Sequence, residues 1–331
     1  MFESLKDVPR LLLEQELRPI QGDRFQPTGF ADLGAADYRL HDGRRMLLVE
    51  SAQSIANHLE ETCLNGSGPD IARKLEGLPY VKAKLQGASD AETSSLIEAH
   101  RINSPFIISD SGFQSSFLSL SCYEKGKAID WKKAAGALFH FDPNALVHGV
   151  FMANLLDGRM RFPRAVTGFV EASDVMEAVS GGVKNSSLDP TGKIRAKSYD
   201  KDVYSNVPYS RMEYTAASIK AYFNVDLALI GGYGLPEPAC DLLIALTLLK
   251  VRRFLASGLR LRTACDLTPS REMDVTAPKG FAVPDEAALL ARVQDGIRAC
   301  TDAGLFAVPA ITVIVCPVVV KADKKDEPAA G

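Results

Sequence analysis

The chain has 331 residues, of which 46% are hydrophobic and 24% are charged, and its formal net charge is −3. This composition is typical of a globular protein with ample apolar surface for a core. The net charge argues against a uniformly basic surface for nucleic acid, although it allows a local basic stripe. The six cysteines form no CxxC pair and the five histidines form no HxxxH pattern, so we expect no metal and no cofactor.

The N-terminal third predicts a strand, a long loop, a short strand and a helix. Residues 10–20 alternate leucines with polar side chains, as a half-buried strand does. The loop at 21–34 is polar, contains several glycines and is longer than a simple turn requires. An apolar strand at 46–49 then precedes a helix that Ser51 caps. Residues 65–145 are less regular, and we expect an insertion with one helix near 90–100 and a lysine-rich turn around Trp131.

The rest of the chain alternates more clearly between elements. Residues 181–214 are polar and turn-rich, so they predict a projecting loop or long hairpin. The period of two at 219–229 is the clearest strand signal. A core helix at 239–256, a strand at 258–267, a helix at 285–303 that Asp285 caps, and a strand at 310–320 follow. Pro317 either interrupts the last strand or places it at a sheet edge. This order predicts an α+β fold with helices on one face of a mainly antiparallel sheet.

Basic residues are concentrated in a few segments. Arg159, Arg161 and Arg164 lie in one run without an acid, and Arg260 and Arg262 end another. The 184–214 span interleaves cations with tyrosines, as single-stranded nucleic acid requires of a binding surface. The helix at Ser51 begins with neutral donors that could meet an anion. Plain capping and ordinary solvated loops explain the same residues, and these alternatives stay open on composition alone.

Several long blocks identify a family that the chain resembles. They are "ELRPIQGDRFQPTGFADLGAADY", "MLLVESAQSIANHLE", "VPYSRMEYTAASIKAYFNVDLALI" and "LLKVRRFLASGLRLRTACDL". Together they resemble the Cas-seven-type backbone subunit, of the RAMP superfamily, in type I-G (formerly I-U) CRISPR Cascade complexes. The resemblance covers most of the chain and is weakest at 65–145 and in the tail.

The resemblance implies an RRM-like, ferredoxin-like palm with a large inserted fingers region and a protruding thumb. The palm maps to 1–64, 146–180 and 215–320, the fingers to 65–145, the thumb to 181–214 and a disordered tail to 321–331. It implies a non-catalytic cytoplasmic subunit that polymerises along the CRISPR RNA (crRNA) spacer and presents it to target DNA. The implied partners are crRNA, target DNA through the guide, copies of itself and other Cascade subunits, and no membrane.

Sequence-independent contacts to the guide backbone are the contact type that such a role needs, because guide sequences vary. The expected RNA-binding residues come from the loop, the first helix, the thumb and the basic runs. They are Arg18, Gln21, Arg24, Gln26, Thr28, Ser51, Gln53, Ser54, Asn57, Arg159, Arg161, Arg164, Lys184, Asn185, Lys193, Arg195, Lys197, Tyr209, Arg211, Arg260 and Arg262.

Two other functions stay open on the sequence. Related type III backbone subunits carry a metal-dependent ribonuclease aspartate after the first strand, and Asp32 and Asp37 occupy the similar loop here. A small-molecule α/β enzyme is the other alternative, but the chain has no GxSxG, P-loop or GxGxxG motif to support it.

Overall fold

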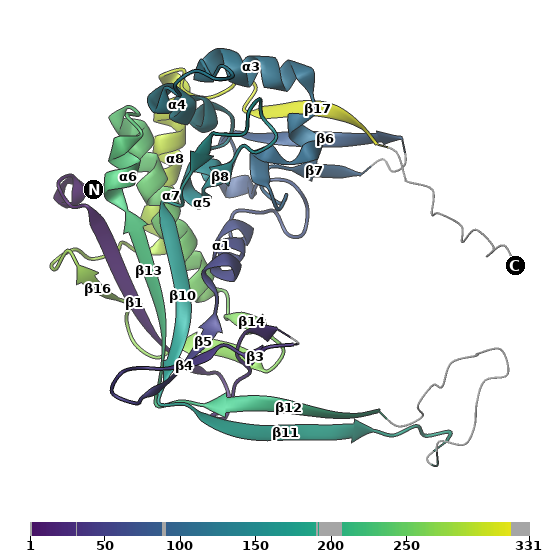
Figure 1. The fold of residues 1–331 in the computed structure, drawn as a ribbon. Coiled ribbons are helices and arrows are strands. Elements are labelled where there is room, and N and C mark those ends of the chain that lie inside the picture. The colour runs from purple at the N-terminus through teal and green to yellow at the C-terminus, as the bar shows by residue number, and fades with distance from the viewer. Residues whose placement is uncertain (1, 31, 88–90, 190, 192–206, 319–331) are drawn as a thin grey trace, which may run out of the picture.

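The computed structural model describes residues 2–30, 32–87, 91–189, 191 and 207–318 (Figure 1). The predicted RNA-binding residues Lys193, Arg195 and Lys197 and the predicted tail 321–331 lie outside the described residues. None of the helices in the described part of the chain combines the length and apolar character that crossing a lipid bilayer requires.

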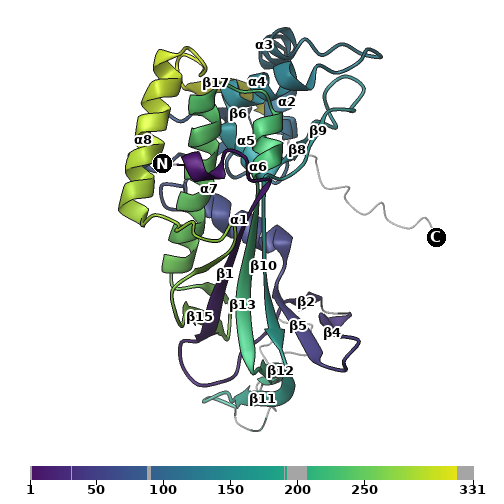
Figure 2. The same cartoon turned by 90° about the vertical axis from the view of Figure 1, so that its left-hand side faces the viewer.

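One large antiparallel sheet dominates the molecule (Figures 1 and 2). Its neighbours run in the order β14, β15, β1, β13, β10, β5 and β4, and β16 also pairs with β1. The strands are β1 (Arg10–Pro19), β4 (Asp37–Arg39), β5 (Arg45–Glu50), β10 (Val166–Ser173), β13 (Ser218–Asp226), β14 (Arg260–Arg262), β15 (Cys265–Pro269) and β16 (Asp274–Ala277).

Strict alternation builds the central strands of this sheet. In β13, Ile219, Ala221, Phe223 and Val225 are buried and the residues between them are half-buried. Neighbouring β1 and β10 follow the same period of two, and both pair with β13 in antiparallel registers. Their buried leucines and valines lie opposite the buried side chains of β13. Because side chains on a strand alternate between faces, each strand buries one row against the helices. The strand predicted at 10–20 is confirmed. The strand predicted at 219–229 is confirmed up to Asp226 and is wrong beyond it, because Asp226 accepts the Leu229 N–H and starts α6 there.

Three helices cover one side of the long strands (Figures 1 and 2). They are α1 (Ala52–Glu61), α7 (Glu237–Ala256) and α8 (Glu286–Asp302), and the short α6 (Leu227–Gly232) leads from β13 towards α7. Ser51 accepts the Ser54 N–H at the start of α1, and Asp285 accepts the Ala288 N–H at the start of α8. Both N-caps are as predicted, since a side-chain oxygen satisfies a backbone donor that has no partner inside the helix.

A second, three-stranded sheet contains β17 (Ile311–Val318), β6 (Tyr80–Gly87) and β7 (Glu92–Ser94), in that order. The sequence assigns the β17 strand to the palm, and this placement is wrong because β17 pairs in parallel with β6 of the inserted region. The apolar pattern of β17 identifies a strand but does not specify its partner. The first pair, Ile311 with Tyr80, joins residues that are 231 positions apart in the sequence. The expected edge position is confirmed, with Pro317 on the outermost strand.

The inserted region is more helical than its sequence indicated. It contains α2 (Pro105–Ile108), α3 (Ser111–Ser121), α4 (Trp131–Phe141) and α5 (Pro143–His148). The predicted turn around Trp131 is wrong, because Asp130 accepts the Lys133 N–H and starts α4 there. The predicted helix near 90–100 is also wrong: 92–94 form β7, whose pairing with β6 overrides the helix preference of the alanines and glutamates.

A long two-stranded hairpin projects from the end of the main sheet (Figure 1). Its strands are β11 (Met176–Lys184) and β12 (Val207–Thr215). Side chains such as Val179, which is 72% exposed, have no core of their own. At its base, Tyr214 is buried and exchanges two backbone hydrogen bonds of 2.9 Å with Phe25 of the loop after β1. The described part of 181–214 therefore has the predicted hairpin form, and the first loop is tied to it.

The remaining elements are short. They are the two-residue strands β2 (Gly29–Phe30), β3 (Gly34–Ala35), β8 (Val150–Phe151) and β9 (Arg161–Phe162), and the 3-10 helices η1 (Glu3–Leu5), η2 (Arg73–Leu75) and η3 (Arg101–Asn103). Among these, the β8–β9 pair and η3 bring arginines from two regions of the chain into one cavity.

Candidate nucleic-acid interface

Two adjoining cavities form a continuous groove between α1, the η3 segment and the β8–β9 pair. The first cavity has a volume of about 800 Å³ and the second about 730 Å³. They share four wall residues, Ala99, His100, Arg101 and Arg164. We call the two cavities together the groove. It brings the polar face of α1, which was predicted to bind RNA, next to the predicted Arg161 and Arg164.

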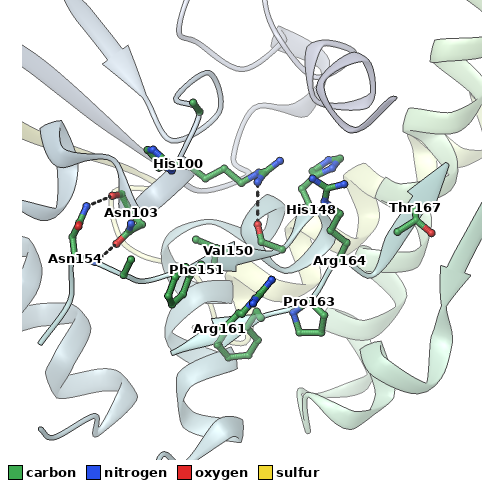
Figure 3. Close-up of a pocket in the computed structure, with 15 residues that line it drawn as sticks. His100, Asn103, His148, Val150, Phe151, Asn154, Arg161, Pro163, Arg164 and Thr167 are labelled. Carbon is green, nitrogen blue, oxygen red and sulfur yellow. Dashed lines mark hydrogen bonds between the residues drawn. The ribbon is translucent and has the colours of Figure 1, made fainter. Parts of the chain in front are cut away.

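The first cavity is basic (Figure 3). Of the described residues that line it, Arg101, Arg161 and Arg164 are cationic and none is acidic. The exposed Arg161 places its guanidinium carbon 5.8 Å from the ring centre of Phe151, which is itself half exposed. Cations beside an exposed aromatic ring suit a strand of phosphates and bases, since the charges meet the phosphates and the ring face can stack on a base.

Arg164 lies where the two cavities meet. Its Nη1 donates to the backbone carbonyl of Ala52, in the first turn of α1, at 3.2 Å. Burial and the nearby charge of Arg101 lower the pKa of Arg164 from its usual value. The Glu60 carboxylate, which Arg101 binds, acts on this pKa in the opposite direction. Arg164 has no carboxylate of its own within 4.0 Å among the described residues, so its charge remains available to an anion.

The second cavity follows the outward face of α1. Ile55 and Leu59 face the core, so Gln53 and Asn57, one turn apart, line the groove. Three glutamates, Glu60, Glu61 and Glu98, also line it, so this cavity is more acidic than the first. Arg101 binds both Glu60 carboxylate oxygens at 2.6 and 2.8 Å and offsets that charge. Ser51 caps the helix and Ser54 supplies the capped N–H, so these two predicted residues have a local structural role whether or not RNA binds.

A buried polar cluster lies beneath the first cavity. The Lys250 ammonium group, from α7, donates to Asn144 Oδ1 and to His148 Nε2, each at 2.7 Å. Burial, and then the charges of Lys250, Arg101 and Arg164, hold the pKa of His148 well below its usual value. His148 is fully buried and therefore neutral. Burial raises the pKa of the neighbouring Asp142 to about 6, even though Ser95 and Lys250 act in the opposite direction.

The Asp142→Asn substitution tests this buried cluster by its dependence on pH. The native pKa of about 6 lies above the usual value of 3.8, so the native state binds the proton more tightly than the unfolded state does. The stability of the wild type relative to the variant should therefore fall by about 2 kcal/mol as pH rises from 4.5 to 7. Urea unfolding of both proteins at the two pH values measures this difference. A difference that does not change with pH would contradict a raised pKa.

The predicted loop residues gather at a separate place. Gln21, Arg24 and Arg260 line a third cavity of about 480 Å³, together with Glu213 and Asp266. The Arg24 guanidinium lies 3.7 Å from Glu213, and the Arg260 guanidinium lies 3.9 Å from Asp266. These carboxylates dilute the local positive charge, so this cavity is less suited to phosphates than the groove. Arg18 is exposed on β1, opposite Thr268.

Two predicted arginines are engaged inside the chain. Arg262 forms an ion pair with the buried Glu50 and donates to the carbonyls of Gln26 and Val49. The Thr28 N–H also bonds to the Val49 carbonyl, so Gln26 and Thr28 belong to the same backbone junction. Arg159 donates to Asp157 and to the Lys127 carbonyl, each at 2.7 Å. The donors of both arginines thus fix loops in place and offer less to a ligand.

The hairpin carries the other predicted residues. Lys184, Asn185 and Tyr209 are exposed, and the Arg211 guanidinium lies 6.0 Å from the Tyr209 ring centre and 3.5 Å from Glu213. Asp37 begins β4, so it does not lie in the first loop as predicted, and it forms an ion pair with Arg45 at 2.8 Å. Among the described residues, no group of three or more His, Cys, Asp or Glu side chains is placed to hold a metal ion. Nothing described around Asp32 or Asp37 favours the nuclease alternative.

Several groove residues were missed from the sequence. They are His100, Arg101, Asn103, His148, Phe151 and Asn154. Asn103 and Asn154 bridge η3 and the loop after β8 through hydrogen bonds of 3.1 and 3.4 Å, drawn in Figure 3. The cluster of His100, Arg101 and Asn103 was the available signal, but it falls at the end of a segment whose sequence predicted a helix.

Comparisons with known proteins give the chain a family. No curated protein matches the chain. A structure described as "CRISPR RNA-guided surveillance complex, pre-nicking" matches with a TM-score of 0.40 and 12% identity, over 89% of this chain and 89% of that chain. The crystal structure of Thermofilum pendens Csc2 matches with a TM-score of 0.30 and 11% identity, over 91% of this chain and 80% of that chain. Both scores are too low to carry a structural argument.

The family model described as "CRISPR-associated protein GSU0053 (Cas_GSU0053)" matches residues 11–177, just over half of the chain. The matched region contains β1, α1, the whole inserted segment before β8, and all three arginines of the groove. The CRISPR-associated family predicted from the sequence blocks is confirmed, and the chain belongs to the family of CRISPR-associated protein GSU0053.

Proposed function

We propose that the chain is the non-catalytic backbone subunit of a type I CRISPR interference complex and holds crRNA through sequence-independent contacts. The observation that carries the proposal is the groove, whose first cavity is lined by three arginines and no acid among the described residues. Arginine and neutral amide donors suit phosphate and sugar contacts, which fix a strand without reading its bases. A net charge of −3 is compatible with this role because the positive charge is local.

The order of elements supports the proposed palm. Along the chain, β1, α1, β10, β13, α7 and β15 follow one another, with β15, β1, β13 and β10 as neighbours in the sheet. A β-α-β-β-α-β order of this kind is the ferredoxin-like arrangement. Residues 65–145, which make up most of the stretch between α1 and β10, then correspond to the proposed fingers, and the β11–β12 hairpin contains the proposed thumb at 181–214. The groove lies between palm and fingers, where a strand could contact both.

We further propose that copies of the chain line up along the crRNA spacer and present it to target DNA, together with other Cascade subunits. A projecting hairpin with many exposed apolar side chains, such as Met176 at 70% and Val179 at 72% exposure, supports contact with a neighbouring copy. A head-to-tail contact between unlike surfaces extends into a filament when it does not close into a ring.

The experiment is to co-express the chain with a matching CRISPR array, purify it in moderate salt and size any bound nucleic acid. We expect intact protected RNA whose lengths increase in fixed steps, and the step measures the footprint of one copy. Binding should weaken steeply with salt, because phosphate contacts release counterions. Protein that carries no RNA in this co-expression, and again none when the other Cascade subunits are co-expressed with it, would contradict the proposal. RNA cut only when magnesium is present would support a nuclease.

A further inference from the structure

The protonation of the buried His148 follows from its contact with Lys250. An ammonium group can only donate, so the His148 Nε2, 2.7 Å from Lys250 Nζ, must accept. A neutral imidazole carries its single proton on the other nitrogen, so Nδ1 is a donor that points away from Lys250. Nδ1 has no hydrogen-bond partner in the described part of the chain, although His148 is fully buried and lines the first cavity. Asp142 Oδ2 and Asn144 Nδ2 of the same cluster also have no partner there, but of the three residues only His148 lines the cavity. A buried donor without a partner costs free energy and indicates a missing acceptor.

Cations converge on the same wall of the cavity. Arg101 and Arg164 line it with His148, and Figure 3 shows Arg164 next to His148. Arg101 is neutralised by Glu60, whereas Arg164 has no carboxylate within 4.0 Å among the described residues. Lys250 lies close enough to the Asp142 carboxyl group to lower its pKa, so its charge is partly offset. Arg164 uses one of its five N–H groups, on the Ala52 carbonyl, so the others are available. The buried Nδ1–H of His148 and the guanidinium of Arg164 together form a site that an anionic acceptor would satisfy.

We propose that this wall seats one phosphodiester group of the bound RNA strand, which accepts from Arg164 and from the Nδ1–H of His148. This inference rests on the proposed function and assigns a particular phosphate to particular donors. His148 lines the cavity but its Nδ1 is buried, so a phosphate reaches Nδ1 only if a neighbouring side chain moves. Arg164 lines the same wall, and among the described residues a single hydrogen bond of 3.2 Å opposes its movement towards the ligand. Lys250 acts as a positioning residue, because it holds His148 in the tautomer that donates.

The test replaces single phosphates in the ligand. The probe is the shortest oligoribonucleotide that the wild type binds measurably, with one neutral methylphosphonate at each linkage in turn. In the wild type, one linkage should show a loss of about tenfold in affinity, the size expected for a charge-assisted contact. In Arg164→Gln and in His148→Gln, the penalty at that linkage should fall to about threefold, because one of the two donors to the phosphate is gone, and in the double variant it should fall below about twofold.

Matched variants separate the outcomes. His148→Gln keeps an acceptor for Lys250 but has no donor at the Nδ1 position. Arg164 is partly exposed, so Arg164→Gln still tests the site if His148→Gln fails to fold. Arg161→Gln, in the same cavity, should weaken binding and keep the penalty at that linkage. An unchanged penalty profile in both test variants would overturn the inference while leaving RNA binding intact. A wild type with no salt-dependent RNA binding would instead overturn the proposed function.

The positioning role of Lys250 has its own readout. With ¹⁵N-labelled histidine, the wild-type His148 should show a protonated Nδ1 and an unprotonated Nε2 near neutral pH. In Lys250→Met, His148 should lose this preference, because nothing then requires Nε2 to accept. A tautomer that is unchanged in the variant, or an Nε2–H tautomer in the wild type, would overturn the assignment.

Discussion

Replacing Arg161 and Arg164 together by glutamine is expected to weaken the binding of single-stranded RNA by about a hundredfold at physiological salt. Both arginines line the first cavity, where the described lining residues include no acid to offset their positive charge. Each charge-assisted contact contributes about 1.5–3 kcal/mol, and two losses at the lower end of this range, about 3 kcal/mol together, amount to about a hundredfold in affinity. The slope of log affinity against log salt should also become shallower by about 0.7 for each phosphate contact removed. Fluorescence anisotropy at several salt concentrations measures both quantities.

The control for this double variant removes equal charge elsewhere. Arg298, on α8, is 68% exposed and pairs only with Asp295 among the described residues, and Lys279 is also exposed. Their double glutamine variant should bind RNA within about threefold of the wild type, because distant surface charges are screened. Circular dichroism checks that all variants fold. If the groove variant keeps both its affinity and its salt slope, the strand runs elsewhere on the molecule.

Much of the main sheet follows from local patterns in the sequence. The alternation in β1 and β13 and the caps at Ser51 and Asp285 are decided by neighbouring residues, so they could be predicted. The β17 strand was recognised, but its parallel partner β6 was not, because pairing depends on contacts between distant segments. Residues 92–94 favour a helix locally and became a strand through that same second sheet.

The groove shows the same division between local and distant information. Gln53, Asn57, Arg161 and Arg164 could be selected by residue type, and the fold does place them around one groove. Arg101 lies in the less regular segment at 65–145, and His148 follows directly after that segment. The role of His148 depends on Lys250, which is 102 residues away in the sequence. The pattern around Lys250 predicts only a core helix, and nothing in it indicates a contact with a histidine. Residue type predicts which chemistry is available, whereas burial and distant partners decide where it is used.

Arg262→Leu is expected to lower the free energy of unfolding by about 3 kcal/mol, which is the typical cost of breaking a buried ion pair. The variant leaves Glu50, whose side chain is 2% exposed, without its cation, and removes hydrogen bonds to the Gln26 and Val49 carbonyls. These contacts join β14 to β5 and to the loop after β1. Arg260→Leu is the matched control, since Arg260 lies on the same strand, is 72% exposed and should change stability by less than about 0.5 kcal/mol. Urea unfolding measures both.

The Arg262→Leu variant also distinguishes a structural role of Arg262 from the RNA-binding role that we predicted from the sequence. If Arg262 is structural, the double variant Glu50→Gln with Arg262→Leu should recover part of the lost stability, because no charge is then buried alone. Where Arg262→Leu remains folded, its salt slope for RNA binding should equal that of the wild type. A slope shallower by about 0.7, with stability equal to that of Arg260→Leu, would instead assign Arg262 a phosphate contact. The 22% exposure of its side chain and its engaged donors favour the structural role.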